Sequence, residues 1–214
     1  MEYSDRFSDM KLNRKVEDVL DKIYKSEGIK YVRSSKQDDL HGVDLYVFSP
    51  NGTSLIIDEK CATQYWNKEL STYSLELTCE STKTGLGWFA PEENNYYLTL
   101  QYMFIWLRAN SSDLSEITSI ELALVDKYTL QQYVLSELGA RPGMSTEELC
   151  EEYFSYSDRR RIVINDDLRI VRSEIAPEWP INAVLSKKKI KELAIWHKIF
   201  RGESLQSIIS EKIK

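Results

Sequence analysis

The stretch that decides the fold is Leu40-His-Gly-Val-Asp-Leu-Tyr-Val-Phe-Ser-Pro-Asn-Gly-Thr-Ser-Leu-Ile-Ile-Asp-Glu-Lys60. Two runs rich in β-forming residues flank Pro50-Asn51-Gly52. Pro favours the first position of a type I turn, Asn tolerates the second, and Gly accepts a positive φ at the third. The pattern therefore predicts a β-hairpin with a three-residue loop, in which Ser49 pairs with Thr53.

Counting outward from this loop sets the register of the two strands. Asp44 is then expected opposite Asp58, and Lys60 lies on the same face because side chains alternate along a strand. Directly opposed side chains have Cβ atoms about 4.5–5.5 Å apart. A two-residue loop at residues 51–52 is the alternative, which would oppose Asp44 to Glu59 and put Lys60 on the far face.

Two carboxylates at this spacing can hold one divalent cation, and without a cation they would repel each other. A Mg²⁺ ion held by two carboxylates keeps several waters and binds substrate phosphates at its remaining positions. It lowers the pKa of a bound water and shields the charge that develops on phosphorus oxygens. A neighbouring Lys can orient or deprotonate the attacking water, or stabilise the pentavalent state. Asp44, Asp58 and Lys60 therefore supply enough groups for phosphodiester hydrolysis with Mg²⁺ or Mn²⁺.

The segments Gly42-Val43-Asp44 and Ile57-Asp58-Glu59-Lys60 together resemble the PD-(D/E)XK nuclease superfamily, which has the restriction-endonuclease-like fold. In that family an Asp near the end of one strand and a (D/E)-x-K tripeptide on the next form the metal and catalytic site. Residues 11 to 80 carry the resemblance. One departure is that Val43 stands where the family usually has Pro.

The resemblance implies a role for each residue that matches the motif. Asp44 and Asp58 would bind the metal, and Lys60 would serve the attacking water. Glu17, on the preceding helix, would complete the metal shell, and the backbone carbonyl of Glu59 would be a further ligand. The implied protein is a Mg²⁺-dependent endonuclease with DNA as the expected substrate, and a homodimer is possible for it.

Composition excludes several other classes of protein. The chain has 214 residues and a net charge of −6, so a uniformly basic nucleic-acid coat is excluded while a local basic groove is not. No apolar run approaches the roughly 18 residues of a membrane span, and no secretory signal is visible at the start. Three cysteines without CxxC spacing favour free thiols in a reducing cytoplasm. With only two His, a zinc site or a His-based triad has few candidates.

The order of expected elements indicates an α+β domain, with α/β-like features, that spans residues 1–214. A mixed central sheet would be flanked by helices, including helices at the C-terminus. Helices are expected at 11–26, 128–138, 145–154, 186–200 and 203–213. Strands are expected at 43–49, 54–60, 72–79, 96–107, 119–125, 161–165 and 168–172.

Several further residues are candidates for the site or for contacts with nucleic acid. The basic candidates are the run Arg159, Arg160 and Arg161, which could contact phosphates, and Lys187 and Lys188. The two lysines begin the segment Lys187 to Lys214, which holds eight Lys or Arg against three Glu. Glu76 lies on the polar face of its strand, and Gln64 and Tyr65 follow the motif lysine. His41 is interpreted as a loop residue, and Trp88 and Trp106 as core.

Two other functions remain open from the sequence. The chain could be a non-catalytic module that keeps the nuclease fold and binds a protein or nucleic acid. It could also be a small inhibitor that presents acidic patches to a nucleic-acid-binding protein. Binding of Mg²⁺ or Mn²⁺ that disappears in Asp58→Ala separates the enzyme from the module. Pull-down of a basic partner that survives excess EDTA tests the inhibitor.

Overall fold

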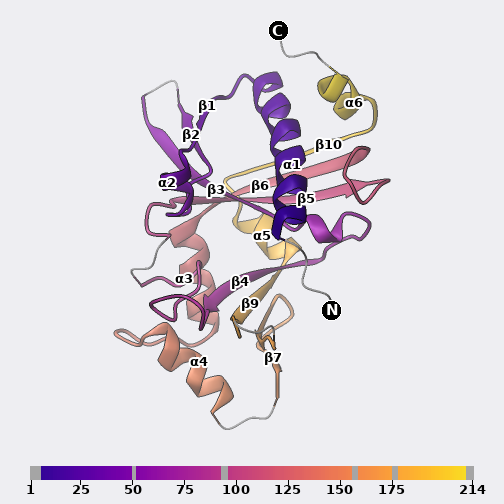
Figure 1. Ribbon diagram of the computed structural model, residues 1–214. Helices are drawn as coiled ribbons and strands as arrows, with labels where there is room; N and C mark the ends of the chain where they lie inside the picture. The colour runs from indigo at the N-terminus through magenta and orange to yellow at the C-terminus, as the bar shows by residue number, and fades with distance from the viewer. Residues whose placement is uncertain (1–5, 50–51, 93–95, 156–158, 175–177, 211–214) are drawn as a thin grey trace.

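A six-stranded mixed sheet forms the centre of the protein (Figure 1). The computed structural model describes residues 6–49, 52–92, 96–155, 159–174 and 178–210. The sheet has the order β1-β2-β3-β5-β6-β10, and its neighbours are antiparallel except for the parallel pair β3 and β5. Its strands are β1 (Lys30–Arg33), β2 (Leu45–Phe48), β3 (Ser54–Cys61), β5 (Gln101–Ala109), β6 (Ile117–Asp126) and β10 (Trp196–Arg201).

A second, four-stranded antiparallel sheet lies below the first in Figure 1 and has the order β4-β9-β8-β7. Its strands are β4 (Thr72–Thr78), β9 (Ile181–Ser186), β8 (Leu168–Arg172) and β7 (Arg161–Val163). The chain passes from β3 through η1 (Thr63–Tyr65) and β4 before it returns to the first sheet at β5. The crossover between the two parallel strands therefore carries a strand of the second sheet.

Two hydrophobic cores cover the two faces of the central sheet, and β5 contributes to both. Met103, Ile105 and Leu107 pack with α1 (Arg6–Ser26) and α6 (Gly202–Ser210) on one face. Tyr102, Phe104 and Trp106 alternate with them and face the other core. Because both faces of β5 are buried, this strand reads as a nearly continuous apolar run.

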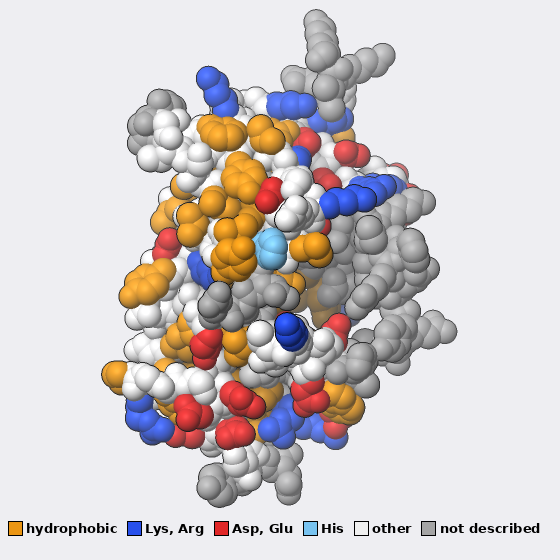
Figure 2. All heavy atoms as spheres, turned by 60° about the vertical axis from the view of Figure 1, so that its left-hand side comes forward, with side chains coloured by type: hydrophobic (Ala, Val, Ile, Leu, Met, Phe, Trp, Pro, Cys, Tyr) orange, Lys and Arg blue, Asp and Glu red, His pale blue; other side chains and the backbone are white. Residues whose placement is uncertain are grey.

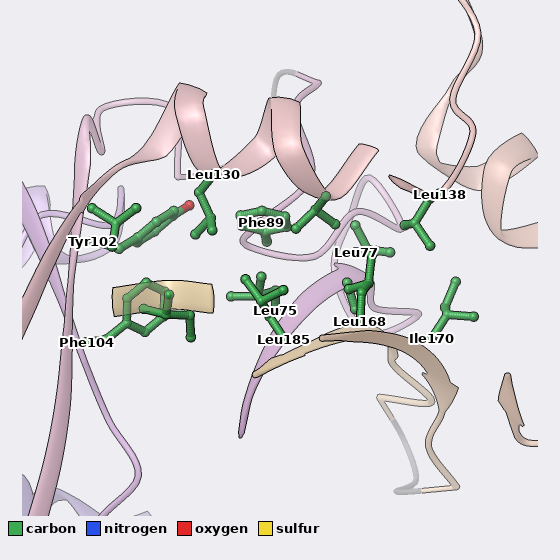
Figure 3. Packing of buried hydrophobic residues seen from close by; sticks show 14 of the residues in the cluster. Leu75, Leu77, Phe89, Tyr102, Phe104, Leu130, Leu138, Leu168, Ile170 and Leu185 are labelled. Atoms are coloured by element: carbon green, nitrogen blue, oxygen red, sulfur yellow. The ribbon is translucent and has the colours of Figure 1, made fainter. Parts of the chain in front are cut away.

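The second core lies between the central sheet, the four-stranded sheet and three helices. These helices are α3 (Lys127–Glu137), α4 (Thr146–Phe154) and α5 (Lys187–Leu193). Figure 3 shows Leu130 and Phe89 above Leu75 and Leu185, with Tyr102 at the side of the central sheet. The two sheets and the helices between them therefore share one apolar interior.

The α+β class and the mixed central sheet are confirmed, and so are most of the expected elements. The helix expected at 145–154 begins with the predicted capping box, in which Ser145 and Glu148 bind each other's backbone N–H groups. The helix expected at 186–200 is wrong in its second half. That half is strand β10, which pairs antiparallel with β6, while the helix ends at Leu193. The short strands β1 and β9 and the short helix α2 (Lys36–Asp39) were not predicted.

The three cysteines are free thiols, as predicted, with Cys79 and Cys150 buried and Cys61 half-buried. Among the residues that the structure describes, no helix is long and apolar enough to cross a membrane.

Candidate metal and phosphodiester site

The hairpin of β2 and β3 has the register that a three-residue loop predicts. Tyr46 pairs with Ile56 and Phe48 with Ser54, and the N–H of Ser49 donates to the carbonyl of Thr53 at 2.9 Å. The alternative two-residue loop is therefore wrong. Gly52 has the expected positive φ of 84°, while Pro50 and Asn51 lie outside the described residues.

The ladder stops one residue before Asp44, so the expected direct pair of Asp44 with Asp58 is absent from it. The last paired residues are Leu45 and Ile57, and the N–H of Asp44 donates to the carbonyl of Ile57 at 2.9 Å. The carboxylate of Asp44 instead accepts the N–H of Glu59 at 2.5 Å. The Asp44 carboxylate thus takes the place of a backbone acceptor for β3, beyond the last paired residue of β2.

This arrangement also determines which way the carbonyl of Glu59 points. In a β-strand the N–H and C=O of one residue point to the same edge, as in the pairs that exchange both bonds. Since the N–H of Glu59 reaches Asp44, its carbonyl points to the same edge, beyond the last paired residue of β2. That edge is where the resemblance predicts a backbone ligand for a metal.

Asp58 and Lys60 lie on one face of β3 and form a buried ion pair. The Lys60 Nζ is 2.8 Å from Asp58 Oδ2, and the Asp58 side chain is only 4% exposed. Apart from Lys60, no donor among the described residues reaches that oxygen. The Lys60 ammonium also lies 4.4 Å from the ring centroid of Trp88 and 5.5 Å from that of Tyr96, within the range of cation–π attraction.

Burial and nearby charges shift the pKa values of two groups in this cluster in the same direction. Burial would lower the pKa of Lys60, but the carboxylates of Asp58 and Asp44 raise it above its ordinary value. Burial, Asp58 and Glu59 raise the pKa of Asp44 from 3.8 to about 8. At neutral pH, Asp44 is therefore largely protonated and Lys60 is charged.

Glu76 and Lys127 complete the polar surroundings of the pair. Burial raises the pKa of Glu76, while the N–H of Trp88, which donates to its carboxylate, and the charge of Lys60 oppose the change. Lys127 donates to the carbonyl of Tyr96 at 2.9 Å, and burial lowers its pKa. The sequence marked Glu76 as a candidate but gave no sign of Lys127, because the partners of Lys127 come from a distant loop.

A close approach of two loops positions Asp44. Gly42 has a φ of 76°, and a Cβ on it would lie 2.5 Å from the Thr99 side-chain oxygen and 2.6 Å from the Tyr96 ring. Thr99, which is buried, donates its hydroxyl to the carbonyl of Gly42. A glycine at this position lets the segment before Asp44 pack directly against the loop that contains Tyr96.

Glu17 does not join Asp58 and Lys60. It is exposed on α1 and lines a small cavity of about 100 Å³ with Asp44, Cys61 and the side chain of Glu59. Because Glu59 alternates with Asp58 and Lys60, this cavity is on the opposite face of β3. The predicted site residues therefore lie on two faces of the sheet. Asp58 and Lys60 are on one face, Glu17 is on the other, and Asp44 lies beside the edge of β3.

The side chain of Glu59 belongs to a network that ties α1 to the sheet. It accepts a hydrogen bond from the Tyr24 hydroxyl at 2.6 Å and pairs with Arg33. Arg33 also pairs with Asp21 at 2.7 Å. Only the backbone of Glu59 is then available to the predicted site.

The donor set fits a magnesium ion better than a metal enclosed entirely by protein ligands. Within the described ranges, no three His, Cys, Asp or Glu side chains form a metal-binding group. Two carboxylates and a backbone carbonyl are nevertheless enough for Mg²⁺, which keeps several waters and takes substrate phosphates as ligands. The buried Asp58 Oδ2 is bound by the Lys60 ammonium, and exchange of that cation would free it for a metal ion.

The remaining candidates lie away from this cluster. Arg160 pairs with Glu174 and Arg161 begins the edge strand β7 of the second sheet, next to Arg159 in sequence. Lys187 contacts Glu121 at 2.5 Å, whereas Lys188 is 78% exposed. The other candidates are His41, whose ring lies 5.3 Å from that of Tyr97, the core residue Trp106, and the exposed residues Gln64 and Tyr65.

On the face of the central sheet that carries Asp58, the side chains of β1 and β2 are partly exposed to solvent. Val32 and Phe48 lie on this face by their pairing and are 56% and 45% exposed. Figure 2, which looks at the side where β1 and β2 lie, shows hydrophobic side chains gathered in its upper half. The polar cluster therefore lies between an exposed apolar surface and the covered core.

Comparisons with protein-family models, with curated proteins and with solved structures find no match for this chain.

Proposed function

We propose that this protein is a Mg²⁺-dependent nuclease that hydrolyses phosphodiester bonds, with DNA as the expected substrate. The observation that carries the proposal is the cluster of Asp58, Lys60 and Asp44 at the end of the β2–β3 hairpin. A cytoplasmic location is part of the proposal, because all three cysteines are free thiols.

Asp44, Asp58 and the carbonyl of Glu59 would hold the ion. When bound, Mg²⁺ would lower the pKa of a coordinated water and shield charge on the phosphate oxygens. Asp44 has to lose its proton before it can act as a ligand, because its pKa is about 8. Asp58 has to exchange the Lys60 ammonium for the metal.

The raised pKa of Lys60 favours one role for this residue over another. A lysine that stays protonated stabilises negative charge and is a poor general base. Once it is released from Asp58, Lys60 can donate hydrogen bonds to a phosphate oxygen, while the rings of Trp88 and Tyr96 keep its ammonium in place. We therefore assign Lys60 to stabilisation of the pentavalent state.

The experiment that tests the proposal pairs Mg²⁺ calorimetry with cleavage of plasmid DNA. Asp58→Asn is expected to lose both metal binding and cleavage. Lys60→Met is expected to lose cleavage but keep metal binding, because it removes the cation that competes for Asp58. Glu152→Gln, an exposed carboxylate outside the cluster, is the matched control and should retain both. Wild-type protein that binds neither Mg²⁺ nor Mn²⁺ would contradict the proposal.

A second candidate is a non-catalytic module that keeps this fold and binds a protein. The observation that favours it is the exposed apolar face beside the cluster, where Val32 and Phe48 lie, because such surfaces mark interaction sites. For this function, Val32→Ser with Phe48→Ser would abolish binding of a partner, and Asp58→Asn would leave that binding intact. The nuclease proposal expects the opposite dependence for cleavage.

A further inference from the structure

A cleft of about 410 Å³ lies on the same face of the central sheet as Asp58 and Lys60, past the end of β3. Trp106 and Glu121 line it from β5 and β6, and Arg201 lines it from β10. Lys68 lines it from the chain that follows η1. Its volume is in the range of sites that hold small organic ligands, roughly 300–1,000 Å³.

Cations predominate among the charged side chains of this cleft, although the protein as a whole is acidic. Lys68, Arg108, Lys187 and Arg201 line it, against Glu69 and Glu121. Glu69 pairs with Arg108 at 3.1 Å, and both side chains are more than half exposed, so water screens this pair strongly.

Glu121 is shared between Lys187, which lines the cleft, and two neighbours outside the lining, Lys191 and His197. It lies 2.5 Å from Lys187, 3.2 Å from Lys191 and 2.8 Å from the ring of His197. Burial would raise the pKa of Glu121, but Lys187, His197 and Lys191 lower it to about 2. Glu121 is thus a fixed anion that holds Lys187 beside the cleft, where the Lys187 ammonium also lies 4.8 Å from the Trp106 ring centroid.

Two cations at the cleft have no ion-pair partner among the residues that the structure describes. Lys68 and Arg201 are exposed, and neither forms an ion pair within the described ranges. An acceptor with several oxygens and a negative charge would satisfy such donors.

We propose that this cleft binds the phosphate groups of an anionic ligand, through Lys68, Arg201 and the neighbouring cations. The same chemistry has two sources, which are a free phosphate compound and the backbone of a nucleic-acid strand. For a strand, the position fits the proposed nuclease. Trp106 is four residues beyond Tyr102, the β5 partner of Asp58, so the cleft lies about 13 Å from the candidate site along the sheet.

The test measures binding in EDTA, so it does not depend on the metal site. Wild-type protein is titrated with inorganic pyrophosphate and, separately, with a fluorescent thymidine octanucleotide. The variant is Lys68→Glu with Arg201→Glu, at two exposed residues whose replacement should leave the fold intact. The control, Lys83→Glu with Arg14→Glu, makes the same change of charge at exposed residues outside the cleft.

Loss of at least about tenfold in affinity in the cleft variant, with less than about a twofold change in the control, is the expected result. Pyrophosphate binding with this dependence identifies a free phosphate compound as the ligand. Tighter binding of the octanucleotide, with an affinity that falls steeply with salt, identifies a strand. The proposal is overturned if neither probe binds, or if variant and control bind equally. Failure of Mg²⁺ binding would leave this result unaffected and would count against the nuclease alone.

Discussion

Replacement of Asp44 by Asn is expected to stabilise the metal-free protein, and more so as the pH rises. Asn keeps an oxygen that can accept the N–H of Glu59 but removes the proton that Asp44 binds. In the wild type, the Asp44 pKa is raised from 3.8 to about 8 by burial and by the charges of Asp58 and Glu59. Between these two values, the folded protein holds a proton that the unfolded chain has lost.

The sign and size of the effect follow from this difference in bound protons. With one more proton in the folded state, the free energy of unfolding falls by about 1.4 kcal/mol for each pH unit in that interval. The stabilisation due to this group is complete below about pH 4 and is lost as the pH approaches about 8. The full pKa difference, from 3.8 to about 8, corresponds to at most about 5–6 kcal/mol of unfolding free energy. Solvent screening at the half-buried Asp44 reduces it, so we expect roughly 2–3 kcal/mol.

Urea unfolding in EDTA at several pH values from about 5 to about 8 measures the effect. The difference in unfolding free energy between Asp44→Asn and wild type should grow across this range. Asp39→Asn, an exposed carboxyl nearby, is the control and should show no such trend. A constant difference for Asp44→Asn would refute a buried, protonated Asp44. A Mg²⁺ titration of the wild type near pH 7 should release a proton, since the metal requires the ionised carboxylate.

Three further substitutions test the packing around the site by urea unfolding. Lys60→Met should destabilise by about 3–5 kcal/mol, because it leaves the buried carboxylate of Asp58 unpaired; adding Asp58→Asn should restore most of the loss. Gly42→Ala should cost more than Gly28→Ala by at least about 1 kcal/mol, because both glycines have positive φ but only the first would bring its Cβ against other atoms. Leu77→Ala should cost about 2–5 kcal/mol, because Leu77 is fully buried between the two sheets. Equal effects of the two glycine variants, or a Leu77 variant as stable as wild type, would contradict the packing described.

The hairpin could be predicted from the sequence because its register depends on local chemistry. Loop length and the alternation of side chains set the pairing from Leu45 to Phe48. The end of the ladder could not be predicted in the same way. The Asp44 side chain, and not its backbone, accepts the N–H of Glu59, and the preceding Gly42 is held by Thr99, a residue from a distant loop.

The C-terminal strand β10 was missed because its stability comes from distant residues. The lysine-rich segment from Lys187 forms a helix, as its composition favours. The chain then becomes extended at Ala194, which has a ψ of 132°, and Trp196–Arg201 pairs with a strand that lies about seventy residues earlier. Nothing within a short window of sequence specifies such a partner.

Glu17 was assigned to the site because its helix precedes the motif, but no sequence pattern states which face of the sheet that helix covers. The structure places α1 against Ile57, Met103 and Ile105, which face away from Asp58. The same alternation that brings Lys60 to Asp58 therefore separates Glu17 from both. The family resemblance supplied the residue, and the packing of α1 decides its position.

The stability of the fold alone does not explain why β3 carries the buried ion pair of Asp58 and Lys60. A buried pair of charges contributes little more than apolar side chains of the same volume, because desolvation offsets the attraction. Here the cluster also contains Asp44, whose carboxyl is kept from ionising. The neighbouring residues of β5 on this face, Tyr102 and Phe104, belong to the apolar core, so apolar side chains would also fit at the positions of the charged cluster. The proposed function offers a reason for the cluster, because exchange of the Lys60 ammonium for a divalent cation would turn Asp58 and Asp44 into metal ligands.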